Sequence, residues 1–149
     1  MTEAPARWDD LAARSAGGHV LQSAAWARVR EQQGWRAEFV RIGDDLPLAL
    51  VLWRDVPFLG LMGYAPRGPI VERGDRDGLA HALEVLAQLA RERGAFLLKV
   101  DPELSDARDQ LAHAGYARGP DVQPVLATLL IDLASDADAL FAALEKDTR

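Results

Sequence analysis

The sequence predicts an α/β fold, in which a mixed β-sheet is flanked by helices. Stretches with apolar residues at helical spacing alternate with β-rich runs along the chain. A length of 149 residues, with 49% hydrophobic and 27% charged residues, suits one domain with one core. The apolar run 95–100 ends at Asp101-Pro102, which stops a strand and leaves a carboxylate at its carboxyl end. Open α/β sheets bind their ligands at that end.

The amino-terminal part predicts two helices. A short one covers 8–14, and the second runs from Ser23 to Gln33, capped by Ser23 and closed by the glycine that follows. On this second helix, Trp26 and Val29 are expected to face the core.

Three strands are expected next. The runs 36–42 and 47–54 are separated by Gly43-Asp44-Asp45, which predicts an antiparallel hairpin. A third strand, 58–64, follows Pro57.

The second half of the chain alternates helices and strands. Apolar residues at helical spacing between the acidic segment Asp75–Asp77 and Gly94 give the clearest helical pattern, from 79 to 90. The remaining expected elements are a strand at 95–100, a helix at 105–114, a strand near 125–133, and a last helix that opens with Ser135 and Asp138 and directs Leu140, Phe141 and Leu144 inward.

The segment Lys99-Val100-Asp101-Pro102 carries the first candidate site. Strand alternation puts Leu97, Lys99 and Asp101 on one side and residues 96, 98 and 100 on the other, so a cation and an anion share a face. This pattern fits a functional carboxylate, and it also fits an ordinary Lys–Asp pair at the edge of a loop.

Two further segments combine a cation with a binding surface. In 64–70, two prolines bracket Arg67 and Gly68, which suits an anion because arginine offers a planar set of donors and glycine lets a ligand approach. The alternative is a rigid surface turn with a solvated arginine. Trp26 and Arg30 share a helix face, which fits either binding or core packing with the arginine reaching solvent.

Composition excludes several functional classes. A net charge of −6 argues against wrapping of bulk nucleic acid by a basic surface. The chain has no cysteine and only three scattered histidines, so we expect no disulfide, no metal site and no cofactor. No apolar stretch approaches the length of a membrane span, and 1–7 lacks the pattern of a secretory signal, so we expect a cytoplasmic protein with no transmembrane segment.

Known catalytic motifs are also missing from the sequence. It contains no Gly-x-Ser-x-Gly elbow, no Walker-type phosphate loop and no Gly-x-Gly-x-x-Gly motif after a strand. The glycine-rich pyrophosphate loop of ordinary acetyl-CoA acetyltransferases is absent too.

The order and spacing of several segments resemble the first domain of the FemABX peptidyltransferases. These segments are Leu21-Gln22-Ser23 with Trp26, Gly34-Trp35, Tyr64-Ala65-Pro66-Arg67-Gly68-Pro69, Lys99-Val100-Asp101-Pro102, Gly115-Tyr116, Gln123-Pro124 and Thr128-Leu129-Leu130-Ile131-Asp132-Leu133.

The resemblance implies a GNAT-like (acyl-CoA N-acyltransferase) fold for residues 1–149, as the N-terminal domain of a longer two-domain protein. It implies transfer of an amino acid from aminoacyl-tRNA to the stem peptide of a peptidoglycan precursor, which builds the interpeptide bridge. The implied partners are a UDP-muramoyl peptide or lipid II, aminoacyl-tRNA bound through the second domain, and the membrane surface. Because the chain ends at Arg149 within a helical pattern, we expect a fragment that is inactive alone.

The same resemblance assigns roles by position. Arg30 is expected at the pyrophosphate of the precursor, and Asp101 is the candidate base for the attacking amine. The other expected substrate-binding residues are Trp26, Tyr64, Arg67, Gly68, Phe96 and Lys99. Phe96 stands where the family can have a tyrosine, so a hydroxyl contact is expected to be lost. The alternatives are another GNAT-like N-acyltransferase acting on a different amine and a noncatalytic interaction domain.

Overall fold

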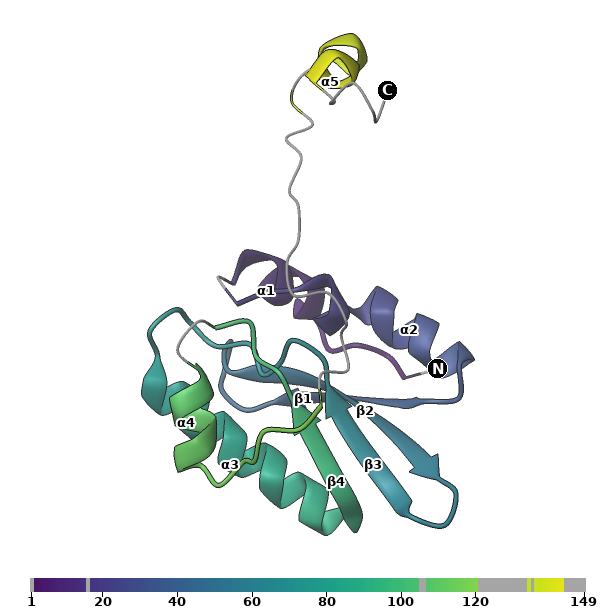
Figure 1. Ribbon diagram of the computed structural model, residues 1–149, viewed down its shortest axis with the longest axis vertical. Helices are drawn as coiled ribbons and strands as arrows, with labels where there is room; N and C mark the ends of the chain where they lie inside the picture. The colour runs from purple at the N-terminus through teal and green to yellow at the C-terminus, as the bar shows by residue number, and fades with distance from the viewer. Residues whose placement is uncertain (1, 16, 105–106, 121–133, 135, 144–149) are drawn as a thin grey trace. The chain divides into compact units, whose positions relative to one another are not determined.

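The computed structural model describes residues 2–15, 17–104, 107–120, 134 and 136–143 (Figure 1). It divides into two compact units, Met1–Gly119 and Pro120–Arg149, which are described separately. The elements of the first unit are α1 (Trp8–Arg14), the 3-10 helix η1 (Val20–Gln22), α2 (Ala24–Gln32), β1 (Arg36–Arg41), β2 (Leu48–Val56), β3 (Gly60–Ala65), α3 (Arg76–Glu92), β4 (Ala95–Val100) and α4 (Ala107–His113). The second unit contains α5 (Ala137–Ala143).

The four strands form one mixed sheet in the order β1-β2-β3-β4. The predicted hairpin is confirmed, because β1 pairs antiparallel with β2 from Arg36↔Trp53 to Arg41↔Leu48. Strand β3 is antiparallel to β2, whereas β4 is parallel to β3. A parallel neighbour needs a long crossover, and α3 supplies it. The sequence therefore predicted the fold class correctly.

Local signals set the helix ends as expected. The Ser23 hydroxyl accepts a hydrogen bond from the Trp26 amide at 3.1 Å, and the Asp75 carboxylate accepts one from the Gly78 amide at 2.8 Å. Both contacts satisfy amides that a helix leaves unpaired at its start. One prediction for α2 is wrong: Val29 is 42% exposed. The buried side of α2 is made by Ala24 and Ala27, whose small side chains let the helix approach the sheet closely.

Both faces of the sheet are covered (Figure 1). On one face, Leu50, Leu52 and Tyr64 pack with Trp8 and Trp35 from the α1 and α2 side. On the other face the side chains of α3 pack against the sheet, in a cluster that comprises Ala49, Val51, Trp53, Ala65, Leu86 and Ala90. Because β2 is covered on both sides, residues 48–53 are buried without alternation.

Strand β3 starts later than predicted, and β4 has the predicted bounds but an irregular start. Strand β3 begins at Gly60 rather than at Phe58, which is fully exposed with φ 67°. In β4, Ala95 pairs with Leu61 and Leu97 pairs with Met62, so the register skips Phe96. This bulge interrupts the alternation and lets Ala95, not Phe96, pack with the α3-side cluster. The first part of β4 is therefore not buried: Phe96 is 47% exposed and Leu97 is 44% exposed.

Only some of the last predicted elements lie within the described residues. Helix α4 lies within the predicted range, and Gly115 follows it with φ 81°. The strand expected near 125–133 lies outside the described residues, as do Ser135 and Leu144. Just before α5 the Asp136 carboxylate accepts a hydrogen bond from the Ala139 amide at 2.9 Å, and within α5 the Phe141 side chain is 58% exposed.

Candidate active site

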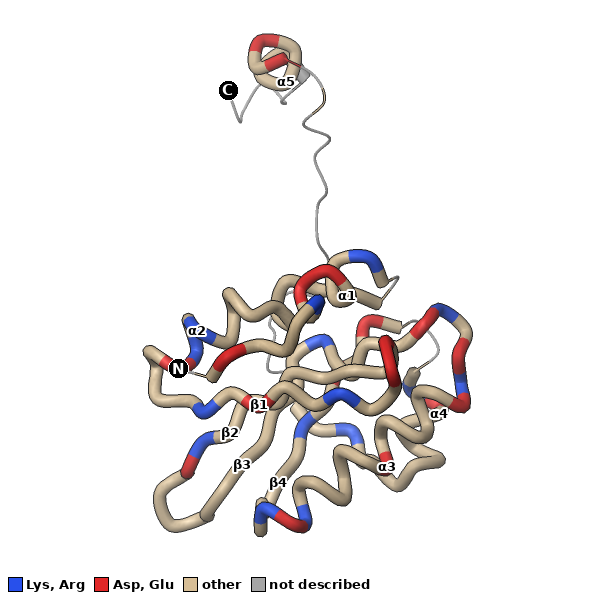
Figure 2. Tube along the Cα trace, turned by 180° about the vertical axis from the view of Figure 1, so that it is seen from behind, with Lys and Arg blue, Asp and Glu red and all other residues tan. Residues whose placement is uncertain are grey.

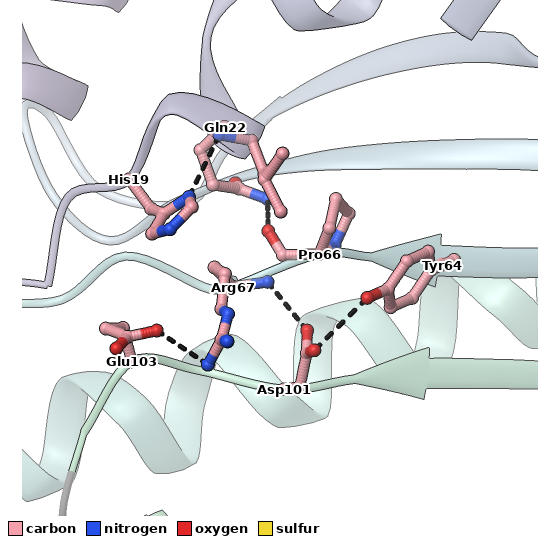
Figure 3. Close-up of polar contacts among 8 residues, drawn as sticks. His19, Gln22, Tyr64, Pro66, Arg67, Asp101 and Glu103 are labelled. Atoms are coloured by element: carbon pink, nitrogen blue, oxygen red, sulfur yellow. Dashed lines mark hydrogen bonds and ion pairs between the residues drawn. The ribbon is translucent and has the colours of Figure 1, made fainter. Parts of the chain in front are cut away.

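Asp101 follows β4 directly and is held by two donors from β3 and the loop after it (Figure 3). The Tyr64 hydroxyl donates to Oδ2 at 3.1 Å, and the Arg67 amide donates to Oδ1 at 2.6 Å. Parallel strands end at the same edge of a sheet, which is why these groups meet although they are far apart in sequence. The carboxylate is half-buried and has a fixed orientation.

Burial raises the pKa of Asp101 above its ordinary value of 3.8, because the charged form loses solvation. The hydrogen bonds from the Arg67 amide and the Tyr64 hydroxyl oppose this effect, as do the positive charges of Arg67 and Lys99. Burial is the larger influence, so the pKa is raised. A carboxylate with a raised pKa holds a proton more tightly and is a better general base.

The loop after β3 is built around Arg67. This residue has φ 53°, and its guanidinium forms an ion pair with Glu103 at 2.8 Å. Its side chain is only 27% exposed, and the buried Nε atom has no hydrogen-bond partner among the described residues. The interpretation as a simple solvated arginine is therefore wrong.

Gln22 fixes the same loop from the other side. It is fully buried, and its amide nitrogen donates to the Pro66 carbonyl at 2.6 Å while its amide oxygen accepts from the Leu50 amide at 2.7 Å. Gly68 lies so close that a Cβ there would approach the Gln22 side chain to 2.7 Å. The role of Gln22 was not predicted from the sequence. The signal that could have identified it is a polar residue directly before the helix cap, in an otherwise apolar segment.

Arg30 stacks on two indole rings. Its guanidinium carbon lies 5.6 Å from the Trp26 ring centroid and 4.8 Å from that of Trp35. The predicted shared face of Trp26 and Arg30 is thereby confirmed. Arg30 also donates to the Gln33 side chain at 2.6 Å, yet its Nε and the Trp26 indole nitrogen are buried and have no hydrogen-bond partner in the described part of the chain. Two neighbouring donors are thus left unused.

A second arginine, not predicted from the sequence, approaches Trp35. The Arg54 guanidinium carbon lies 5.6 Å from the ring centroid. Burial lowers the pKa of Arg30, and the positive charge of Arg54 lowers it further. Among the described residues, no carboxylate forms an ion pair with either arginine. Two cations near each other without an acid favour an anionic ligand. A signal for Arg54 was present in the sequence. It lies two residues after Leu52 in the same strand, and such residues share a strand face.

Tyr64 links the two groups of residues. It belongs to the same cluster as Trp35, it interacts electrostatically with Arg30, and its hydroxyl binds Asp101. Arg30 and Asp101 therefore lie toward the same face of the sheet.

The other predicted residues fall into two sets. Lys99 is opposite Tyr64 in the strand register, and Gly68 lies in the loop beside Asp101. Phe96 is not brought to this group, because it sits five residues before Asp101 on an extended strand, roughly 17 Å away. The hydroxyl at Asp101 comes from Tyr64 on β3 instead.

A family comparison bears on this arrangement. The model of the FemAB family matches residues 5–142. The chain belongs to the FemAB family. The relatives with curated names include a lipid II:glycine glycyltransferase of Staphylococcus saprophyticus, 27% identical over 89% of this chain and 36% of that protein. The Staphylococcus aureus protein of the same name is 26% identical over 89% of this chain and 35% of its own length. The chain thus spans about a third of these FemAB relatives.

Solved structures agree with the FemAB assignment. The crystal structure of FemX matches with a TM-score of 0.68 and 25% identity, over 77% of this chain and 31% of FemX. A probable acetyltransferase matches with a TM-score of 0.53 and 13% identity, over 87% of this chain and 97% of that one, which concerns the fold alone. The predicted GNAT-like sheet is confirmed by this likeness.

The described part of this FemAB chain lacks two features. No helix there combines the length and apolar composition that a membrane crossing requires. The same residues contain no group of three or more His, Asp or Glu side chains placed to hold a metal ion.

Proposed function

We propose that this chain is the N-terminal, precursor-binding domain of a longer two-domain aminoacyltransferase. The enzyme moves an amino acid from aminoacyl-tRNA to the stem peptide of a peptidoglycan precursor, and the second domain binds the tRNA. Membership of the FemAB family and the names of the relatives support this activity. The observation that carries it is the half-buried Asp101 carboxylate, oriented by Tyr64 and Arg67 on the sheet face that Arg30 shares.

Aminolysis of an aminoacyl ester needs a neutral amine. Asp101 accepts a proton from the attacking amine of the stem peptide, and its raised pKa makes it a stronger base for that step. The Tyr64 hydroxyl and the Arg67 amide keep both carboxylate oxygens in place. The amine attacks the ester carbonyl directly, so this mechanism requires no serine or cysteine nucleophile. As the amide bond forms, the ester C–O bond breaks and the tRNA leaves as its ribose alcohol, which takes the proton that Asp101 accepted from the amine. A cation for the developing oxyanion comes from the second domain.

Arg30 binds the pyrophosphate of a UDP-muramoyl peptide or the corresponding group of lipid II. The absence of an ion-paired carboxylate on Arg30 among the described residues supports this role, because a phosphate would supply the missing negative charge. Arg67, Gly68 and Lys99, which lie near Asp101 and Tyr64, bind the acceptor end of the precursor in this proposal. Such a precursor and aminoacyl-tRNA are cytoplasmic, so the protein works there, with a peripheral membrane contact when the acceptor is lipid II.

The test is calorimetric titration of the 149-residue chain with a UDP-muramoyl pentapeptide. Arg30→Ala is expected to weaken binding at least about tenfold, because a charged hydrogen-bonding partner of phosphate is lost. Arg28→Ala is the matched control, since Arg28 is exposed on the same helix. Equal affinities of the Arg30→Ala variant and the wild type would contradict the proposal.

Two further measurements separate the alternatives. The isolated chain is expected to show no aminoacyl transfer, because half of the cleft belongs to the second domain. Stabilisation by acetyl-CoA, with no effect of the muramoyl peptide, would instead indicate another GNAT-like N-acyltransferase. Failure of both ligands to raise the melting temperature would indicate a noncatalytic domain.

A further inference from the structure

Arg67 contacts two different acids of the segment that follows β4 (Figure 3). Its backbone amide donates to Asp101 Oδ1 at 2.6 Å, and its guanidinium Nη1 atom forms an ion pair with Glu103 Oε2 at 2.8 Å. Pro102, between the two acids, favours extended backbone at Asp101, and side chains two residues apart on an extended chain point the same way. Both carboxylates are therefore directed toward one arginine.

The direction of the Arg67 guanidinium matters for Asp101. An arginine and a carboxylate bind strongly when two parallel hydrogen bonds form between them. Such a pair with Asp101 would lower the pKa of that carboxyl, because a nearby positive charge favours the ionised form. In the structure the guanidinium is turned toward Glu103 instead (Figure 3). The contact with Glu103 therefore keeps a neighbouring cation away from Asp101.

Stability alone does not explain the ion pair between Arg67 and Glu103. The Glu103 side chain is 45% exposed, and an ion pair with a solvated partner contributes little to stability. Arg67 has φ 53°, a backbone conformation that is uncommon for a residue with a side chain and that persists where the surroundings fix it. A role in placing the charge of Arg67 explains this arrangement better than a role in stability.

The charges that act on Asp101 are local. Acidic and basic residues are interspersed along the trace of the first unit (Figure 2), so the net charge of −6 does not determine the potential at one carboxylate. The groups that bear on this carboxylate are the amide and the charge of Arg67, the Tyr64 hydroxyl and the charge of Lys99. His19 lies on the other side of the loop, where its Nδ1 atom accepts from a backbone amide at 3.1 Å (Figure 3). Arg67 is thus one of two cations that act on Asp101 in the described part of the chain.

We propose that Glu103 is a positioning residue for the aminolysis step: by binding the Arg67 guanidinium it keeps this cation off the Asp101 carboxylate, which stays able to accept a proton from the acceptor amine. This inference rests on the proposed function, in which Asp101 is the base. A carboxylate paired with an arginine holds a proton weakly and is a poor base for that step. In this assignment Glu103 does not bind the substrate and acts through Arg67.

The test is an NMR titration of the Asp101 carboxyl ¹³C resonance in the 149-residue chain, without any precursor. Glu103→Gln frees the guanidinium, so the pKa of Asp101 is expected to fall below its wild-type value. Glu103→Asp keeps a negative charge for Arg67 and is expected to give a higher pKa than Glu103→Gln does. Glu84→Gln is the matched control, because Glu84 is an exposed acid on α3 whose charge does not act on Asp101. A wild-type pKa of Asp101 in Glu103→Gln would overturn the proposal.

A second background separates this role from a direct effect of the Glu103 charge. Loss of a negative charge near Asp101 would by itself lower the pKa, whether or not the guanidinium moves. Glu103→Gln is therefore also made in an Arg67→Gln background, which removes the guanidinium and keeps the backbone amide that donates to Asp101. In that background Glu103→Gln should leave the pKa of Asp101 unchanged. An equal fall of the pKa in both backgrounds would overturn the proposal.

Binding of the UDP-muramoyl pentapeptide distinguishes failure of this inference from failure of the proposed function. The exposed position of Glu103 predicts that its variants keep the wild-type melting temperature, which shows that they are folded. A wild-type chain that does not bind the pentapeptide would contradict the proposed function, while the effect of Glu103 on the pKa of Asp101 stays measurable. Normal pentapeptide binding without that effect would remove Glu103 from the mechanism and leave the proposed function intact.

Discussion

The Tyr64 hydroxyl donates a hydrogen bond to the Asp101 carboxylate at 3.1 Å, joining β3 to the residue that follows β4. This bond favours the ionised carboxylate and lowers its pKa, against the larger effect of burial. Tyr64→Phe removes the bond, so the pKa of Asp101 is expected to rise further above 3.8. Titration of the Asp101 carboxyl ¹³C resonance by NMR measures this pKa. Tyr116→Phe is the control, because that hydroxyl donates to the Leu83 carbonyl instead. A lower pKa in Tyr64→Phe would contradict the assignment.

The raised pKa of Asp101 has a consequence for stability. The folded protein holds this proton more tightly than the unfolded chain does, so stability falls as pH rises from below 3.8 through the folded pKa and is constant above it. Asp101→Asn cannot ionise, and its amide oxygen can still accept from Arg67. The variant should therefore gain stability relative to wild type as pH rises through this window. Urea unfolding at a series of pH values measures the difference, and a difference that shrinks with pH would refute it.

Gly68 is packed against the Gln22 side chain, with a virtual Cβ at 2.7 Å from its amide nitrogen. Gly68→Ala must displace the buried amide and its bonds to Pro66 and Leu50, which should destabilise the fold by about 1–3 kcal/mol. At Gly17, a Cβ would lie 3.5 Å from the nearest atom, an ordinary contact, so Gly17→Ala serves as the control. The free energies of unfolding in urea compare the two, and equal losses would show that the Gln22 contact is unimportant.

Arg54 and Arg30 both stack on Trp35 and repel each other. Arg54→Gln is expected to weaken binding of the UDP-muramoyl pentapeptide by about threefold to tenfold, while the stability of the free chain does not fall. Calorimetry and urea unfolding measure the two quantities. Arg41→Gln, at an exposed position at the end of β1, is the control. Binding at wild-type strength in Arg54→Gln would remove Arg54 from the site.

Features with strong local signals were predictable from the sequence. Ser23 and Asp75 cap helices through their own side chains, and Pro102 stops β4 so that Asp101 lies at its end. Features set by pairing between distant segments were not. The bulge at Phe96 arises from the register with β3, and the approach of Arg54 to Trp35 depends on how β2 lies beside the start of β1.

The prediction that Val29 of α2 faces the core was wrong for a related reason. Helical periodicity identifies a stripe of residues but not which neighbouring stripe meets the sheet, and here the alanines do so while Val29 does not. Two parts of the candidate site, the Asp101 carboxylate and the Trp26–Arg30 pair, were predicted from the spacing of residues in the sequence. Gln22 was missed because its importance comes from burial and from hydrogen bonds to Leu50 and Pro66, which are distant in the sequence.

The parallel pairing of β3 and β4 also determines which changes in length this domain can tolerate. Residues added to or removed from the crossover around α3 leave the carboxyl ends of both strands at the same edge. Asp101 and the Arg67 amide then stay within bonding distance, whatever the crossover length. A slip of β4 by two residues along β3 keeps every side chain on its face but moves the carboxylate by roughly 7 Å. The loops that flank α3 can therefore vary in length, whereas the buried leucines of α3 and the register of these two strands are constrained.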